Sequence, residues 1–490
     1  MKKVSKVLSI LLSVVLVISS FYLLYQVIRL NVLPSKFLFP LTIGVVVLDA
    51  IFILLLIYFS KNVVSKIICI VLTLFICVAS CMGGYYISKT QNVLSNITNV
   101  AKHAKNTVSV IVKESSSIKN KSQLNGVSVG SLRLNEQGSK KVLKELSNEG
   151  IVLNQTEYDS MTALLEAFYN GEVDSIIINE SSRSQILDME AYSNFDSNTR
   201  VVYQTSFEVK NNDSASAVSD ITSKPFNVLI SGSDTRGGFD ENGRSDVIMV
   251  ATVNPKTHTI LLTSVPRDFY VTTACDAGDG CMQGALDKIT HTGIHGTNTT
   301  KRTVEQLLGI EINYTFKVGF DTVTELVDVL GGVDVYVEPG YATTTSEFSV
   351  HEGVNHLNAQ QALAFARERY SYTEGDRQRT KNQQQVLMGI VKEATKPSVI
   401  TNYAAIMDTM ANTFSTTMSN EEITDLIKYQ LNNNPTWKME QYMVDGTGDT
   451  LMCAELGDAA SVMVPDQSTV KMAKDKINAV LAGKSSEDVK

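Results

Sequence analysis

Residues 243–268 read GRSDVIMVATVNPKTHTILLTSVPRD and contain two apolar or β-branched runs, 247–253 and 259–265. Runs of this length that are rich in Val, Ile and Thr are typical of β-strands. Neither run alternates with polar residues, so we expect both faces of each strand to be covered by other parts of the chain. Sheets of that kind carry helices on both sides. This stretch therefore predicts an α/β fold of the α-β-α sandwich type.

The sequence around this stretch supplies more strands and helices of the same fold. Three further short runs predict strands at 227–231, 315–318 and 333–337. Helical spacing and helix-ending residues predict four helices, at 300–308, 322–330, 358–367 and 376–395. We therefore expect the sandwich domain to occupy residues 226–490.

A smaller α/β domain is predicted ahead of the sandwich. Residues 91–210 contain strand-like and helix-like stretches in alternation, and we interpret them as an accessory domain that acts as a spacer or contacts other proteins. Residues 211–225 are rich in Ser, Asp and Ala, which is typical of a linker. The predicted elements of the accessory domain are strands at 108–112, 127–132, 175–179 and 200–205 and helices at 136–148 and 161–170.

The first 90 residues predict a membrane anchor. Three apolar segments are long enough to cross a bilayer, which takes about 20 residues: Val7–Ile28, Phe37–Phe59 and Val63–Tyr86. Lys2, Lys3 and Lys6 favour a cytoplasmic N-terminus, so three crossings place the chain after about residue 90 outside the cell. Asp49, inside the second segment, is either part of an intramembrane relay or partner contact, or a polar residue that faces another helix.

The charge balance excludes one class of ligand. The chain has 43 basic and 51 acidic residues, and the first 90 residues hold eight of the basic ones and a single acid. The remaining 35 basic and 50 acidic residues give the region after residue 90 a net charge of −15. Non-specific binding to nucleic acid depends on neutralising its phosphates with Lys and Arg, so we expect no nucleic-acid partner.

Two cysteines lie close together in the predicted extracellular region. Cys275 and Cys281 bracket the short loop Asp-Ala-Gly-Asp-Gly. A disulfide fits this spacing outside the cytoplasm, and a metal site is the alternative. Cys453 has no evident partner in the sequence.

Arginine residues are concentrated in a few short clusters. Seven of the eleven arginines after residue 90 lie in four clusters, each with a carboxylate residue in it. Guanidinium groups bind phosphate oxygens in pairs, and nearby carboxylates hold a divalent metal ion or position a nucleophile. On the predicted fold these clusters fall at strand ends and in loops, where the chemistry of open α/β sheets collects. They are 233–236 with 244–246, 266–268, 367–369 and 376–379.

Two interpretations of these clusters compete. A single Arg–Asp pair is often a surface ion pair that contributes only about 0–1 kcal/mol. Four clusters at loop and edge positions favour a pyrophosphate site instead, with Arg236 and Arg377 as the members best explained by surface charge. Asp376, Arg379 and Gln383 recur at helical spacing, so they share one face of the predicted helix.

The same stretches resemble the catalytic domain of the LytR-CpsA-Psr family. Three apolar segments followed by an extra extracellular domain are also similar to the capsule-associated members of that family. The stretches that carry the resemblance are NVLISGSDTR at 227–236, residues 243–268, GFDTVTELVDVLGGVDVYVE at 319–338, ALAFARERY at 362–370 and EGDRQRTKNQQQVL at 374–387.

The resemblance implies a function. Such a protein would be a multi-pass, membrane-anchored phosphotransferase of Gram-positive-type envelopes. It would move a glycopolymer, such as capsular polysaccharide or a teichoic-acid-like polymer, from polyprenyl pyrophosphate to a hydroxyl of peptidoglycan. Its implied partners are the lipid-linked glycan, the peptidoglycan acceptor, the membrane and other envelope polymer-assembly proteins. Apolar helix faces over the sheet would form a groove for the prenyl chain.

The resemblance also implies roles for individual residues. Asp234 and Asp246 would bind Mg²⁺ or Mn²⁺ beside the pyrophosphate, and Asp376 would accept the proton of the attacking hydroxyl, acting with Arg267 and Arg379 in catalysis. Asn382 stands where many members have a second arginine, so a charged contact is missing at that position. The residues implied to bind the pyrophosphate are Arg244, Arg267, Arg367, Arg369, Arg379 and Gln383.

Three functions agree with these residues. The first is the glycopolymer transferase, and the second is a pyrophosphatase that uses the same arginines with water as the acceptor. The third is a non-catalytic binding or regulatory protein of the envelope, which would bind the lipid-linked glycan without converting it.

The predicted topology can be tested in intact cells. If three crossings place the region after residue 90 outside, then protease added to intact cells should remove that region and leave only the anchor, as seen by immunoblotting of an N-terminal tag. Full protection of the chain, with cleavage only after lysis, would contradict the predicted orientation.

Overall fold

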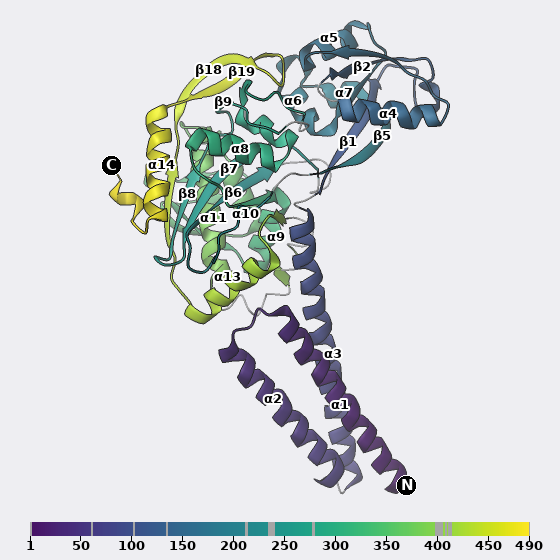
Figure 1. Cartoon of the computed structure of the whole chain (residues 1–490), viewed down its shortest axis with the longest axis vertical. Coiled ribbons are helices and arrows are strands. Elements are labelled where there is room, and N and C mark those ends of the chain that lie inside the picture. Colours follow the sequence, from purple (N-terminus) through teal and green to yellow (C-terminus); the bar gives the residue numbers. More distant parts are fainter. Residues whose placement is uncertain are drawn as a thin grey trace. The chain divides into compact units, whose positions relative to one another are not determined.

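The computed structural model describes residues 2–59, 62–100, 103–133, 136–210, 214–233, 241–276, 280–396, 405–406, 409 and 414–489. The chain divides into two compact units (Figure 1). One unit comprises residues 1–96, 393–411 and 419–436, and the other comprises 97–392, 412–418 and 437–490. The mixture of sheets and helices confirms the predicted α/β class.

The first unit contains the three long apolar helices that the sequence predicts. Within them, three stretches are long and apolar enough to cross a membrane, with mean hydropathies of 2.5 to 2.7. Ser20 Oγ donates a 2.9 Å hydrogen bond to Asp49 Oδ1, so the buried Asp49 faces the neighbouring helix. The helices are α1 (Lys2–Leu30), α2 (Ser35–Leu54) with a π-helical end at Leu55–Phe59, and α3 (Val63–Val100).

The accessory region folds around a five-stranded sheet with the order β3-β2-β4-β1-β5. Alternate residues of its strands enter two separate cores: Ile176 and Ile178 pack with α5 on one face, and Ile177 packs with α4 on the other. The sequence analysis missed β3, because its residues are polar and mostly exposed at the sheet edge. The elements are β1 (His103–Lys113), β2 (Ser128–Leu132), β3 (Asn154–Tyr158), β4 (Ser175–Asn179), β5 (Thr199–Lys210), α4 (Glu136–Asn148), α5 (Met161–Asn170) and α6 (Arg183–Asp188).

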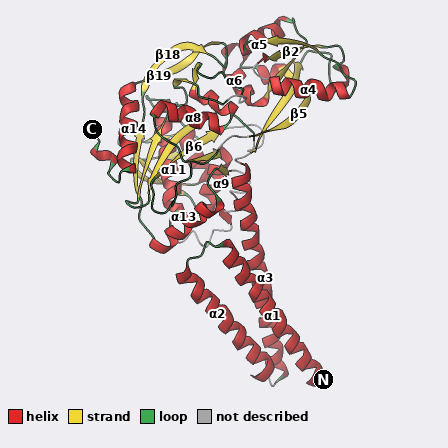
Figure 2. Cartoon of the chain, viewed as in Figure 1, coloured by secondary structure: helices red, strands yellow, loops and turns green. Residues whose placement is uncertain are grey.

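The larger domain contains a six-stranded sheet with the order β16-β11-β6-β7-β8-β17, drawn as a layer of strands between helices in Figure 2. Strands β6, β7 and β8 are antiparallel neighbours, whereas β11 and β17 are parallel to β6 and β8. The strands are β6 (Phe226–Ser233), β7 (Val247–Asn254), β8 (Thr259–Ser264), β11 (Tyr314–Gly319), β16 (Phe414–Thr416) and β17 (Lys438–Met443).

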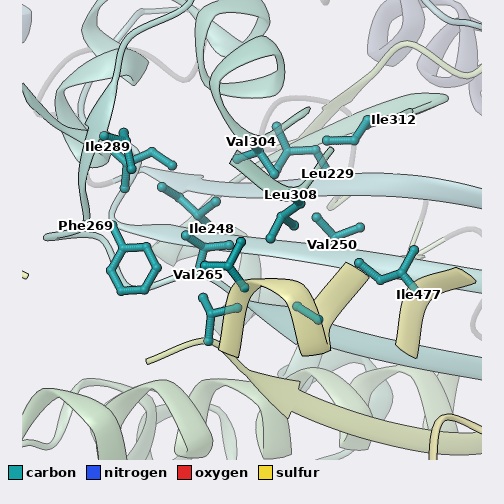
Figure 3. Packing of buried hydrophobic residues seen from close by; sticks show 14 of the residues in the cluster. Leu229, Ile248, Val250, Val265, Phe269, Ile289, Val304, Leu308, Ile312 and Ile477 are labelled. Atoms are coloured by element: carbon teal, nitrogen blue, oxygen red, sulfur yellow. The ribbon is translucent and has the colours of Figure 1, made fainter. Parts of the chain in front are cut away.

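Helices pack on both faces of this sheet. On one face, Leu229 and Val250 of the strands pack against Val304 and Leu308 of α8 and Ile477 of α14 (Figure 3). The other face carries residues of α9, α10 and α11 over Ile230 and Met249. The helices are α8 (Thr297–Leu308), α9 (Phe320–Leu330), α10 (Ala359–Arg367), α11 (Asp376–Ala394) and α14 (Gln467–Leu481).

One predicted strand lies elsewhere. Residues 333–337 form β12, which pairs with β15 (Gly353–Leu357) in a separate two-stranded sheet. Val333, Val335 and Val337 are buried, while Asp334 and Tyr336 between them are less buried or exposed. This alternation is typical of a strand covered on one face only, so the interpretation as a strand of the central sheet was wrong.

The antiparallel register brings several chain ends to one edge of the six-stranded sheet. Gly232, near the end of β6, pairs with Val247 at the start of β7, and Met249 pairs with Ser264 at the end of β8. The end of β6, the start of β7 and the end of β8 therefore lie side by side. The residues that flank these strand ends are brought together for the same reason.

The two nearby cysteines form a disulfide, Cys275–Cys281, which decides between the two interpretations of that loop. Cys453 is a free thiol and is fully buried among Leu456 and Val462. Burial and the neighbouring Asp287 carboxylate raise the pKa of Cys453 to about 12. This thiol is therefore protonated and unreactive in the folded protein.

Glu440 of β17 fixes the C-terminal segment to the sheet edge and offers a test of the fold. It accepts 2.8 Å hydrogen bonds from Ser485 Oγ and from the Ser486 backbone, and a contact of the same length from Lys438 Nζ. Burial raises the pKa of Glu440, but these hydrogen bonds outweigh burial and lower it to about 2. The stabilisation is therefore complete above the ordinary glutamate pKa of about 4.3 and is lost as the pH falls toward 2.

We expect Glu440→Gln to lower the free energy of unfolding by about 1–3 kcal/mol at pH 7. The difference from the wild type should shrink as the pH falls from about 4.5 toward 2. Urea unfolding at several pH values measures both effects. Glu347→Gln, at an exposed position, is the matched control and should change stability by less than about 0.5 kcal/mol. A difference that does not depend on pH would contradict this role of the carboxylate.

Candidate oxyanion-binding site

Three of the predicted arginines lie on segments that border the same sheet edge. Arg244 precedes β7, Arg267 follows β8, and Arg379 lies in the first turns of α11. Their side chains are 15%, 21% and 13% exposed, so all three are largely withdrawn from solvent. Burying guanidinium groups is unfavourable unless charged or polar partners accompany them.

Arg267 is held by two carboxylates. Its Nη1 donates a 2.8 Å hydrogen bond to Asp246 Oδ1, and its Nε lies 3.8 Å from Asp268 Oδ2. Lys288 Nζ contacts the other oxygen of Asp268 at 3.3 Å. Burial lowers the pKa of Arg267, but Asp246 and Asp268 outweigh burial and raise it. Arg267 is therefore a permanent positive charge in a fixed orientation.

Arg379 is paired with Asp376, one turn earlier on α11. Burial is the main cause that lowers the pKa of Arg379, and the positive charges of Arg267 and Arg369 lower it further against the attraction of Asp376. Arg267 and Arg369 therefore both lie close enough to Arg379 to repel its charge. A bound anion would relieve that repulsion.

Arg244 completes the group. Its Nη1 forms an ion pair with Asp188 of the accessory domain, and its Nε lies 3.9 Å from Asp246 Oδ1. Thr290 Oγ1 also donates to Asp246 Oδ1, at 3.4 Å. Asp246 is thus shared by Arg244, Arg267 and Thr290.

The three buried arginines have one feature in common. In each, a terminal nitrogen holds a carboxylate, while the Nε of Arg244, Arg267 and Arg379 is buried and has no hydrogen-bond partner among the described residues. Leaving a buried donor unpaired is costly, and more so when the group is charged. Phosphate oxygens are suitable partners for such donors, because arginine binds them through adjacent N–H groups. The arrangement is therefore suited to binding an oxyanion.

The remaining predicted arginines differ in their surroundings. Arg369 Nη2 donates a 2.6 Å hydrogen bond to Tyr370 Oη, and its guanidinium lies 4.7 Å from the Tyr370 ring centroid. Arg367 is exposed at the last position of α10, so its place in the site stays a prediction. Arg377 is exposed and forms a 2.7 Å ion pair with Asp445, as a surface charge would.

The predicted metal ligands can be placed only in part. Asp234, like Arg236, lies outside the described residues, so its role stays a prediction. Within the described parts of the chain, no group of three or more His, Cys, Asp or Glu side chains could hold a metal ion. Mg²⁺ commonly binds through only one or two carboxylates together with substrate phosphates. The carboxylate of Asp246, beside the unpaired arginine nitrogens, fits a site of that kind.

An apolar cavity opens beside this group. It has an empty volume of about 580 Å³ and lies between the sheet and helices α9, α10 and α11. Gln383, four residues after Arg379 on α11, and Ser233 are the polar residues in its lining. The apolar lining residues are Ile230, Val247, Met249, Val318, Val323, Leu363, Ala366, Val386, Leu387 and Ile390.

Asn382 has a structural role. Its side chain is 1% exposed, donates a 3.0 Å hydrogen bond to the Phe365 carbonyl and accepts one of the same length from Gln378 Nε2. The bond to Phe365 joins α11 to α10, and the bond from Gln378 lies within α11. The side chain at this position is therefore used for helix packing and does not supply charge to the arginine group.

Sequence reasoning missed three residues that contact the arginine group. Lys288, Thr290 and Asp188 reach it through tertiary contacts with Asp268, Asp246 and Arg244. They lie far along the chain from those partners and belong to no recognisable motif. The sequence offers one weak signal for Lys288 and Thr290. They lie at and just after the end of the short strand β10 (Leu286–Lys288), and strand ends are where site residues collect.

Comparison with known proteins identifies the family. Residues 192–479 match the LytR_cpsA_psr family. The chain belongs to this family. A family member from Bacillus cereus (strain AH820), "Polyisoprenyl-teichoic acid--peptidoglycan teichoic acid transferase TagU", is 33% identical over 207 residues, which is 42% of this chain and 65% of the relative. The TagU of Bacillus subtilis (strain 168) is 34% identical over 203 residues, or 41% of this chain and 63% of the relative.

The chain thus spans just under two thirds of the length of these relatives. Solved structures of family members are also similar to it. The crystal structure of B. subtilis TagU has a TM-score of 0.41 at 28% identity, and covers 53% of this chain and 97% of that one. Protein gbs0355 from Streptococcus agalactiae has a TM-score of 0.45 at 25% identity, and covers 54% of this chain and 89% of that one.

The oxyanion site can be tested by direct binding. We expect Arg267→Lys to weaken the binding of inorganic pyrophosphate to the detergent-solubilised chain by about tenfold or more, because lysine cannot reproduce the paired N–H donors. Isothermal titration calorimetry measures the affinity. Arg377→Lys, at the exposed pair with Asp445, is the matched control and should bind as the wild type does. Unchanged affinity in Arg267→Lys would show that only net charge matters and would contradict the role of the paired donors.

Proposed function

We propose that this family member is a membrane-anchored phosphotransferase that transfers a cell-wall glycopolymer from polyprenyl pyrophosphate to peptidoglycan. One observation carries the proposal: three buried arginines are each oriented by a carboxylate and each keep a buried Nε without a hydrogen-bond partner among the described residues. Phosphoryl transfer depends mainly on positioning the phosphates and neutralising their charge. The names of the relatives, which are teichoic acid transferases, support the same reaction.

The position of the apolar cavity supports a lipid-linked donor. Gln383 lines the cavity one helical turn beyond Arg379, so a molecule with its pyrophosphate among the arginines could extend its hydrocarbon part between the sheet and the helices. Polar head and apolar chain would then each meet a matching environment. The three apolar helices confine the protein to the membrane in which such a donor resides.

The proposed reaction requires a nucleophile and a leaving group. An acceptor hydroxyl of peptidoglycan attacks the phosphorus that bears the glycan, and its oxygen forms the new phosphodiester bond. The P–O bond to the second phosphate breaks, and polyprenyl phosphate leaves with that electron pair. Asp376, which pairs with Arg379 and is partly exposed, would accept the hydroxyl proton. Arg267 and Arg379 would neutralise the charge that develops on the phosphate oxygens.

A divalent cation completes the proposal. Asp246, together with Asp234, would hold Mg²⁺ or Mn²⁺, which when bound neutralises charge on the pyrophosphate and orients it. The carboxylate of Asp246 also keeps Arg267 in place, so the same residue serves two purposes. The transferred polymer is proposed to be of the capsular type, in a Gram-positive envelope, because three apolar helices and an accessory domain precede the sandwich domain.

A reconstituted assay tests the proposal. The full chain, a short saccharide on polyprenyl pyrophosphate, a peptidoglycan fragment and Mg²⁺ should yield a glycan-phosphate adduct on the acceptor, detected by mass spectrometry. Arg379→Ala should lower the rate at least about 100-fold, and removing Mg²⁺ with a chelator should have a similar effect. Arg302→Ala, at an arginine outside the site that pairs with Asp276, is the control. Release of free sugar phosphate without an adduct would identify a pyrophosphatase instead, and binding without any product would identify a non-catalytic protein.

A further inference from the structure

The segment that carries Arg244 and Asp246 is held by the accessory domain. Glu241, at the start of this segment, is buried and accepts a hydrogen bond from Thr107 of β1. The Glu241 backbone carbonyl accepts a hydrogen bond from Lys317 of β11. Three residues later, Arg244 forms its ion pair with Asp188. The accessory domain thus contacts residues 241–246 at two points, on either side of a short stretch.

Asp188 is itself fixed in place. It is the last residue of α6, and the next residue, Met189, packs against the buried Cys453 and Leu456 of the larger domain. Nearby, Thr162 of α5 donates hydrogen bonds of 3.3 Å to the Leu456 carbonyl. These contacts hold the end of α6 against the larger domain, so the Asp188 backbone is fixed near Arg244, although the Asp188 side chain is 61% exposed.

The Asp188–Arg244 pair has the same form as the Asp246–Arg267 pair within the larger domain, because both carboxylates contact Nη1. Asp246 holds Arg267 and Asp376 holds Arg379 by a terminal nitrogen, and each of these arginines keeps a buried Nε without a partner among the described residues. In Arg244, the terminal nitrogen Nη1 is occupied by Asp188, and Nε is likewise unpaired there. The Nε–H of Arg244 is then available to donate a hydrogen bond to a phosphate oxygen.

We propose that Asp188 is a positioning residue, through which the accessory domain orients Arg244 toward the pyrophosphate of the donor. The inference rests on the function proposed above, because it assigns Arg244 to the same oxyanion. Among the described residues, the Asp188 carboxylate contacts Arg244, and through that residue it would act on the donor. Carboxylates of the larger domain pair with Arg267 and Arg379, and the accessory domain supplies the carboxylate that pairs with Nη1 of Arg244. The accessory domain is thereby a structural part of the donor site and more than a spacer.

An alternative is that Asp188 competes with the donor for Arg244. In that case the carboxylate would have to leave before phosphate could bind. Two observations favour the positioning role: Asp246 contacts Nη1 of Arg267 just as Asp188 contacts Nη1 of Arg244, and the buried Nε of Arg244 is not the nitrogen that Asp188 occupies. The two roles predict opposite changes in affinity.

Two measurements on the full-length chain in detergent test the inference: the affinity for inorganic pyrophosphate, by calorimetry, and the KM and kcat for the lipid-linked donor. We expect Asp188→Asn to weaken pyrophosphate binding and to raise the donor KM, each by about fivefold to tenfold, with kcat changed less than twofold. Asp188→Glu should restore most of the affinity, because it keeps the carboxylate. Asp159→Asn, at another exposed ion-paired aspartate of the accessory domain, should bind as the wild type does.

The double variant with Arg244→Gln separates positioning from a general effect. If Asp188 acts through Arg244, Asp188→Asn should add less than twofold to the loss caused by Arg244→Gln alone. Unchanged affinity in Asp188→Asn, while Arg244→Gln binds weakly, would overturn the inference and leave the proposed function intact. Tighter binding by Asp188→Asn would overturn it in favour of competition. If the wild-type chain did not bind pyrophosphate, both the inference and the proposed function would fail.

Discussion

A guanidinium group can be buried only if negative charge or hydrogen-bond acceptors accompany it, and the ion pair between Arg267 and Asp246 meets this constraint at the edge of the central sheet. The pair can form because β7 begins where β8 ends, as the register of Met249 with Ser264 fixes. Register, burial and charge are therefore linked: a sheet slipped by one residue would separate the carboxylate from its arginine. The other arginines of the site follow the same rule with their own carboxylates.

Much of the fold could be predicted because local signals agreed with the final structure. Helix α5 begins after its Ser160 cap and ends at Gly171, where the chain takes a left-handed conformation, and the capping box of Asn358 and Gln361 starts α10 as expected. Strand β3 could not be predicted, because an exposed edge strand has no apolar pattern to reveal it. Strand β12 was assigned to the wrong sheet, because a short valine-rich run does not indicate which strand it pairs with.

The candidate site shows the same division between local and tertiary information. Arg267, Arg379 and Asp246 could be singled out because charged residues at predicted strand and helix ends stand out in the sequence. Their partners Lys288, Thr290 and Asp188 could not, because each contact joins segments that are distant along the chain. At Asn382, where many family members have a second arginine, the side chain instead donates a hydrogen bond to α10, a tertiary contact that the sequence does not indicate.

The cysteines carry a consequence for biogenesis. Besides the bonded pair, the part of the chain outside the apolar helices holds a third thiol, Cys453, which folding encloses completely. In an oxidising compartment, an unfolded chain with three thiols can cross-link in three ways, and only one of them is native. Wrong pairing with Cys453 is prevented once the hairpin of β18 (Gly446–Cys453) and β19 (Asp458–Pro465) has buried the Cys453 thiol. Enclosure of Cys453 in the folded hairpin therefore protects the Cys275–Cys281 bond from exchange with this thiol.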